Sequence, residues 1–125
     1  VRPEMAKTTI GTYYYMCPET MDDKPYNGKC DMWALGCMIH ELMTLERPFQ
    51  GVGPFALFDN IKHVRPPLLP SGKYSWYLRA TAIWLLQKDP EYRPDAFNLY
   101  SHFLRNWSDL ALKTADGYSH VRPES

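Results

Sequence analysis

The fold is decided by residues 29–45, which read KCDMWALGCMIHELMTL. Apolar residues recur in this stretch at spacings of three and four, so they share one face of a predicted helix: Met32, Leu35, Gly36, Ile39, Leu42 and Met43. Further apolar side chains flank this stripe, and the helix is therefore expected to be buried on most sides. It is too short and carries too many charges to span a bilayer.

Three residues of this stretch stand out. Asp31 falls in the first turn, where the helix dipole favours a carboxylate that can accept backbone N–H bonds. Gly36 lies mid-helix, where glycine costs about 1 kcal/mol relative to alanine and usually indicates a close approach by another backbone. The indole N–H of Trp33 needs a hydrogen-bond partner. Taken alone, these features favour an ordinary core helix.

Composition limits the function classes. With 125 residues, 45% of them apolar, the chain is one domain or part of one. Its 14 basic residues balance 14 acidic ones, which argues against a nucleic-acid or membrane partner. We expect Cys17, Cys30 and Cys37 to be reduced thiols of a cytoplasmic protein, since they are odd in number and lack metal-ligand spacing. A start at Val1, without a signal peptide, suggests that an upstream segment is absent.

Three further helices are predicted. One covers residues 55–63, a second begins at a capping Ser75 and ends near Lys88, and a third begins at a capping Asp95. Beyond Asp109 the chain turns polar, and we expect residues 110–125 to be a fraying tail. The prediction is a mainly α fold, in which four principal helices are joined by long proline-rich loops.

Three motifs occur in one order along the chain. Residues 11–19 read GTYYYMCPE, residues 31–37 read DMWALGC and residues 89–94 read DPEYRP. Together they resemble the end of the activation segment, the central helix and the segment before the last helix of a eukaryotic protein kinase catalytic domain. The resemblance covers residues 8–107 and implies a C-terminal kinase lobe over residues 1–109, without the N-terminal β lobe. Residues 67–71 (PLLPS) are similar to the NIMA-related (NEK) Ser/Thr kinases.

The resemblance assigns structural roles to several residues. It implies that Asp31, with Trp33 and Gly36 on the same helix, anchors the catalytic loop. It also implies that Glu19 and Arg93 form a buried ion pair, a structural clamp in which arginine holds the carboxylate with two hydrogen bonds. The alternative is that Glu19 and Arg93 are two unrelated surface charges.

The resemblance also assigns residues to substrate and regulation. Thr12, Tyr13 and Met16 are the implied substrate-positioning residues, with Tyr13 where most relatives have proline. Thr8 matches the usual activating phosphosite, and Thr9 is the neighbouring candidate. An ordinary polar loop is an equally good interpretation of these two threonines.

The resemblance implies ATP and Mg²⁺ as cofactors of a full-length kinase and protein Ser/Thr residues as its substrate. The catalytic machinery needs a glycine-rich loop, a phosphate-binding lysine, magnesium ligands and a catalytic aspartate. None of the motifs Gly-x-Gly-x-x-Gly, Val-Ala-Ile-Lys, His-Arg-Asp or Asp-Phe-Gly occurs in the sequence. We therefore expect no catalytic residue and no cofactor binding here, and the missing N-terminal half of the domain as a partner.

The four histidines have no partners at ligand spacing, so no metal site is expected. The alternative function is a non-catalytic helical protein-interaction module derived from a kinase lobe.

Overall fold

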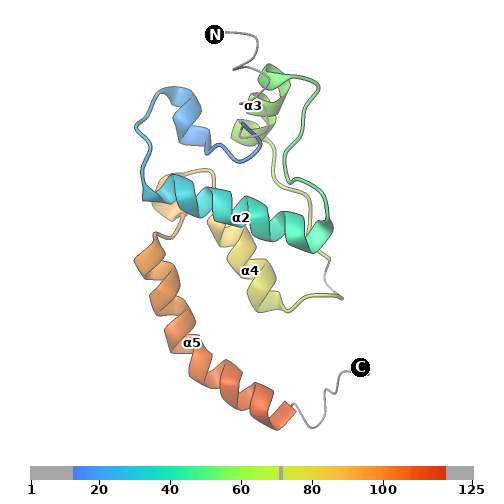
Figure 1. Ribbon diagram of the computed structural model, residues 1–125, viewed down its shortest axis with the longest axis vertical. Helices are drawn as coiled ribbons and strands as arrows, with labels where there is room; N and C mark the ends of the chain where they lie inside the picture. The colour runs from blue at the N-terminus through green and yellow to red at the C-terminus, as the bar shows by residue number, and fades with distance from the viewer. Residues whose placement is uncertain (1–12, 71, 118–125) are drawn as a thin grey trace. The chain divides into compact units, whose positions relative to one another are not determined.

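The computed structural model describes residues 13–70 and 72–117, with side chains up to residue 106 (Figure 1). Over these residues the fold is all-helical and has no strand, which confirms the predicted fold class. It contains four α-helices and two short 3-10 helices: η1 (Pro18–Asp22), α2 (Gly28–Thr44), α3 (Pro54–His63), α4 (Trp76–Leu85), η2 (Pro90–Tyr92) and α5 (Ala96–Gly117).

Helix α2 follows the predicted stretch to within one residue at each end. The side chain of Asn27 caps it by accepting a 2.9 Å hydrogen bond from the backbone N–H of Lys29. At the other end Leu45 has a left-handed backbone, with φ of 62°, and its N–H donates to the carbonyl of Glu41 at 2.7 Å. Local sequence therefore explains the start of this helix, whereas at its end Leu45 occupies a position that usually favours glycine or asparagine.

Helix α4 packs across α2 (Figure 1). A Cβ atom at Gly36 would lie 2.7 Å from Cβ of Leu85 and 3.0 Å from Cδ2 of Leu86. The close approach predicted from this mid-helix glycine is present, and the element that approaches is α4.

Helix α4 ends three residues earlier than predicted. Ser75 caps its start as expected, accepting from the N–H of Leu78 at 3.2 Å. Beyond Leu85 the helical pattern is lost: the N–H of Gln87 donates to the carbonyl of Trp84 at 3.4 Å, and the carbonyl of Gln87 accepts from Arg93 at 3.0 Å.

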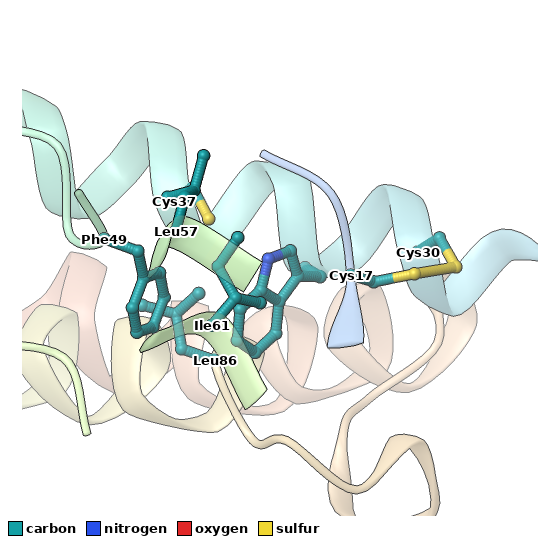
Figure 2. Packing of buried hydrophobic residues seen from close by; sticks show 8 residues of the cluster. Cys17, Cys30, Cys37, Phe49, Leu57, Ile61 and Leu86 are labelled. Atoms are coloured by element: carbon teal, nitrogen blue, oxygen red, sulfur yellow. A yellow bond between two sulfur atoms is a disulfide. The ribbon is translucent and has the colours of Figure 1, made fainter. Parts of the chain in front are cut away.

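A buried apolar cluster joins α2, α3 and the loops around them (Figure 2). The ring of Trp33 stacks on Phe49, with centroids 5.5 Å apart and planes inclined by 13°. Ile61 and Leu57 enter from α3, and Leu86 follows α4. Partly buried residues of the segment before α2 pack against this cluster.

The cysteine prediction is wrong for two of the three residues. Cys17 and Cys30 form a disulfide, visible in Figure 2, whereas Cys37 is a free, buried thiol. Cysteine number and spacing could not reveal this pair, because η1 folds back and brings Cys17 to the first turn of α2, with the two Cα atoms 5.3 Å apart.

The chain divides into two compact units, residues 1–94 and residues 95–125, which we describe separately. The second unit contains α5, whose first turn is capped by Asp95 as predicted: its Oδ1 accepts from the N–H of Asn98 at 2.6 Å. The helix continues to Gly117, beyond Asp109, where we expected fraying. Across the described ranges, no helix combines the length and apolarity needed to cross a membrane.

Candidate functional site

Glu19 and Arg93 form a buried ion pair. Nη1 of Arg93 donates to Oε2 of Glu19 at 2.8 Å, and Nη2 donates to Oε1 at 3.0 Å. The side chains are 4% and 0% exposed, respectively. The contact is therefore a bidentate, desolvated pair, which is the geometry that a guanidinium provides and an ammonium does not.

The other N–H groups of Arg93 are also used. Nε donates to the carbonyl of Gln87 at 3.0 Å, and Nη1 donates to the carbonyl of Lys29 at 2.9 Å. Nη2 donates a further 2.8 Å bond to Gln87, and the guanidinium lies 5.1 Å from the ring centre of Trp33. Because every donor has a partner, the cost of burying the charge is largely offset.

These contacts bring three segments of the first unit together. Glu19 belongs to η1, Lys29 to the first turn of α2, and Gln87 to the segment between α4 and η2. The ion pair therefore fixes the loop of residues 13–19 against two elements distant in sequence. Cys17, two residues before Glu19, is tied to α2 by the disulfide as well.

The start of that loop rests on α3. The ring of Tyr13 meets the ring of Phe58 edge-on, with centroids 5.2 Å apart. The backbone N–H of Met16 donates to the carbonyl of Tyr13 at 3.2 Å, which closes a tight turn. Tyr13 and Met16, two of the three predicted substrate-positioning residues, are half-buried, so each retains an accessible surface.

The middle of the loop contacts the end of α2. The hydroxyl of Tyr15 donates to Oε2 of Glu41 at 2.6 Å, and this hydrogen bond, aided by burial, raises the pKa of Tyr15 above its usual value. The guanidinium of Arg47 lies 4.1 Å from the ring centre of Tyr14. The three consecutive tyrosines thus each have a defined neighbour.

Asp31 is exposed. Its carboxylate accepts a hydrogen bond from the hydroxyl of Tyr26, and this bond raises the pKa of Tyr26. The role implied for Asp31 needs a catalytic loop, and the sequence contains no His-Arg-Asp motif to supply one. The anchoring role therefore stays a prediction.

The other two residues of the implied anchor are buried in α2. Gly36 admits α4, as described above. The indole Nε1 of Trp33 has no hydrogen-bond partner in the part of the chain that the structure describes, although we expected one. The ring is held by stacking and by the nearby guanidinium rather than by its polar atom.

Thr8, Thr9 and Thr12 lie outside the described residues. The candidate phosphosites and the first of the three substrate-positioning residues therefore remain predictions. The described part of the candidate site begins at Tyr13.

Sequence reasoning missed Lys88. Its Nζ donates to the carbonyl of Ile61 at 2.5 Å and lies 4.5 Å from the ring centre of Phe49. Burial lowers the pKa of Lys88 from 10.5 to about 8. The sequence gave only a weak sign of this burial: Lys88 comes two residues after the apolar pair Leu85–Leu86 at the end of α4.

A second missed feature is a group of ligand-type atoms. The side-chain ligand atoms of Cys17, Glu19 and Cys30 lie within 4.8 Å of one another, all in buried positions. Spacing in the sequence gave no sign of this group, because Cys17 precedes η1, Glu19 lies in η1 and Cys30 lies in α2. The two sulfurs are bonded to each other and the carboxylate is paired with Arg93.

Comparison with known proteins identifies the family. The family model described as "Protein kinase domain" matches residues 1–104. The chain belongs to this family. It is 42% identical over 92 residues to mouse serine/threonine-protein kinase Nek1 and 43% identical over 93 residues to mouse Nek9, covering 73% and 74% of the chain. It is 35% identical over 121 residues to rice Nek6, covering 96% of the chain.

The NIMA-related resemblance is thus confirmed at the level of similarity. The chain spans only 8% of mouse Nek1, 10% of mouse Nek9 and 22% of rice Nek6. Its similarity is therefore to a small part of each relative.

Within the described part of the chain, the grouped ligand atoms do not suit Mg²⁺. Magnesium prefers oxygen ligands in octahedral geometry, whereas the grouped ligand atoms described above are two bonded sulfurs and a carboxylate held by an arginine. The motifs that hold the phosphates and the metal are absent from the sequence. We therefore derive no step of phosphoryl transfer from these residues.

Proposed function

We propose that this chain is the substrate-docking half of a Ser/Thr protein kinase of NIMA-related type and that it transfers no phosphate by itself. The observation that carries the proposal is the bidentate, buried pair of Glu19 and Arg93, which holds the loop beginning at Tyr13 in a fixed position. A loop that presents a protein substrate to a phosphoryl donor must be held rigidly, because small displacements of the reacting groups cost rate.

In this proposal Tyr13 and Met16 form part of the pocket for the residue next to the phosphoacceptor. Their side chains are half-buried, and the ring of Tyr13 packs edge-on against Phe58, which suits a shallow apolar depression. Thr12 precedes this turn in the chain, where its hydroxyl would position the catalytic aspartate of the complete domain. Tyr13 in place of proline predicts a pocket wall with a broad aromatic face.

The N-terminal half of the kinase domain is the proposed partner. Met38 and Leu42, four residues apart on α2, are 53% and 75% exposed, and Leu45, the residue that follows the helix, is 86% exposed. An exposed apolar patch of this kind is typical of a surface that another element covers. The carboxylate of Asp31, at the opposite end of the same helix, would bind backbone N–H groups of the catalytic loop.

A chimera tests the proposal. Residues of this chain replace the matching 92-residue segment of mouse Nek1, and phosphorylation of a protein substrate is measured with ATP and Mg²⁺. We expect the chimera to be active and the Glu19→Gln version to be strongly impaired. The matched control, Lys62→Met, removes an exposed ion pair and should leave activity intact. A folded but inactive chimera would refute the docking role.

The second candidate is a non-catalytic protein-interaction module. The exposed apolar patch of α2 also favours this function, because it could bind a partner without any nucleotide. The two candidates differ in a simple way. If the chain is an interaction module, the isolated chain should bind a partner and the chimera should be inactive. If it is the substrate-docking half of a kinase, the chimera should be active.

A further inference from the structure

We propose that Cys17 and Cys30 form a reversible thiol–disulfide site that locks the loop of residues 13–19 to the first turn of α2, with a glutathione-type disulfide as oxidant. This inference goes beyond the proposed function and does not depend on it. Its basis is the position of the two sulfurs, their burial and their shared neighbours.

The backbone holds the two cysteines in bonding position from two separate elements. Their Cα atoms are 5.3 Å apart, within the usual range for a disulfide. Cys17 is the residue that precedes η1, and Cys30 lies in the first turn of α2. Both are 2% exposed. The folded chain therefore keeps the pair together and away from other thiols.

The surroundings of the pair can accommodate both redox states. Oγ1 of Thr20 lies 2.7 Å from the sulfur of Cys17 and 3.6 Å from that of Cys30. Oε2 of Glu19 lies 3.8 Å from the sulfur of Cys30. In the reduced chain these oxygens can accept from the two S–H groups, so opening the disulfide leaves no buried thiol proton without an acceptor.

A metal site is the competing use of these atoms. Cys17, Glu19 and Cys30 supply three ligands, but both oxygens of Glu19 already accept hydrogen bonds from Arg93. A divalent cation bound there would lie beside a buried guanidinium, and its charge would be repelled. The charge distribution therefore favours sulfur redox chemistry over metal binding.

The reaction balances as a two-step exchange. The thiolate of one cysteine attacks oxidised glutathione, forms a mixed disulfide and releases one glutathione thiolate. The second cysteine then attacks the protein sulfur of that mixed disulfide and releases the second glutathione. The two cysteines together lose two electrons and two protons, and one oxidised glutathione becomes two reduced ones. Because both sulfurs are buried, the rate should follow opening of the loop.

The first experiment counts thiols in the 125-residue chain. The chain is equilibrated in buffers of varied reduced-to-oxidised glutathione ratio, quenched with an alkylating reagent under denaturing conditions, and analysed by peptide mass spectrometry. We expect one alkylated cysteine, Cys37, in oxidising buffer and three in reducing buffer. Cys37→Ala should preserve the Cys17–Cys30 linkage, whereas Cys17→Ser and Cys30→Ser should abolish it. Three free thiols at every ratio would overturn the proposal.

The second experiment measures the mechanical consequence of the link. Closing a loop of 13 residues should raise the melting temperature of the oxidised chain by on the order of 10 °C relative to the reduced chain. Amide exchange of residues 13–19 should also be slower when the chain is oxidised. The double variant Cys17→Ser/Cys30→Ser should melt at the same temperature in both buffers. Equal melting and exchange of both wild-type forms would contradict the locking role.

The third experiment measures zinc binding by titrating the reduced chain with zinc. Stoichiometric zinc binding that is lost in Cys30→Ser would assign the cluster to metal and overturn the redox proposal. Absence of such binding, together with the linkage above, supports it.

Discussion

Replacing Glu19 by glutamine should destabilise the fold severely, although the side chain keeps its shape. The carboxylate accepts two N–H bonds from Arg93 at 2.8 and 3.0 Å. A glutamine amide can accept only one of them and presents its own N–H₂ to the other donor. The guanidinium then stays buried without a counter-charge, and removing one partner of a buried pair costs about 3–5 kcal/mol. That is a large fraction of the roughly 5–15 kcal/mol that stabilises a typical domain.

Urea unfolding followed by tryptophan fluorescence measures this loss. Trp33 is a suitable probe because its ring lies 5.1 Å from the guanidinium of Arg93. We expect Glu19→Gln and Arg93→Met each to lower the midpoint with little change in slope. The double variant should lose about 1–3 kcal/mol less than the sum of the two single losses, because each single change already removes the shared contact.

An ion pair that is at least as short but far more exposed is the control. Nζ of Lys62 lies 2.6 Å from Oδ1 of Asp22, with side chains 33% and 48% exposed. Water screens this pair, so Lys62→Met should change stability only slightly. A Glu19→Gln loss no larger than that of Lys62→Met, or strictly additive losses at Glu19 and Arg93, would refute the reasoning from burial.

Three further perturbations follow from local geometry. Gly36→Ala should cost about 1–3 kcal/mol and lower the melting temperature, because its Cβ would lie 2.7 Å from that of Leu85; an unchanged melt would contradict this contact. Burial lowers the pKa of Lys88 from 10.5 to about 8, so at this residue the unfolded chain binds more protons between these values, and Lys88 should make a contribution to stability that rises with pH across that window. Urea unfolding at several pH values should show the free energy of unfolding of wild type rising relative to that of Lys88→Met; an unchanged difference between the two would contradict this. Tyr15→Phe removes the 2.6 Å bond to Glu41 and should cost about 1–2 kcal/mol by urea unfolding; no loss would show that water replaces the bond.

Periodicity and capping residues predicted the helices well. The spacing of apolar residues located α2, and Ser75 and Asp95 began α4 and α5 at the predicted residues. These features are determined within a few residues of sequence. The early end of α4 shows the limit, since the carbonyls of Gln87 and Lys88, just beyond it, accept hydrogen bonds from Arg93, and helix periodicity does not reveal such contacts.

Contacts between distant segments were accessible only through the resemblance or not at all. No pattern of spacing connects Glu19 with Arg93, which the kinase motifs alone paired. No sequence motif indicates the disulfide or the burial of Lys88, because both depend on how η1, α2 and α3 pack together. Local sequence likewise gave no means of predicting that the indole N–H of Trp33 would lack a partner.

The span of the ion pair also bears on how the chain acquires its fold during synthesis. Arg93 lies 74 residues after Glu19, and ribosomes add about 5–20 residues per second. The carboxylate therefore spends roughly 4–15 seconds exposed to water before its guanidinium is even made. During that interval structure formed by residues close in sequence, such as α2, can form, but the Glu19–Arg93 ion pair cannot. The nascent chain therefore has to avoid self-association until this ion pair forms.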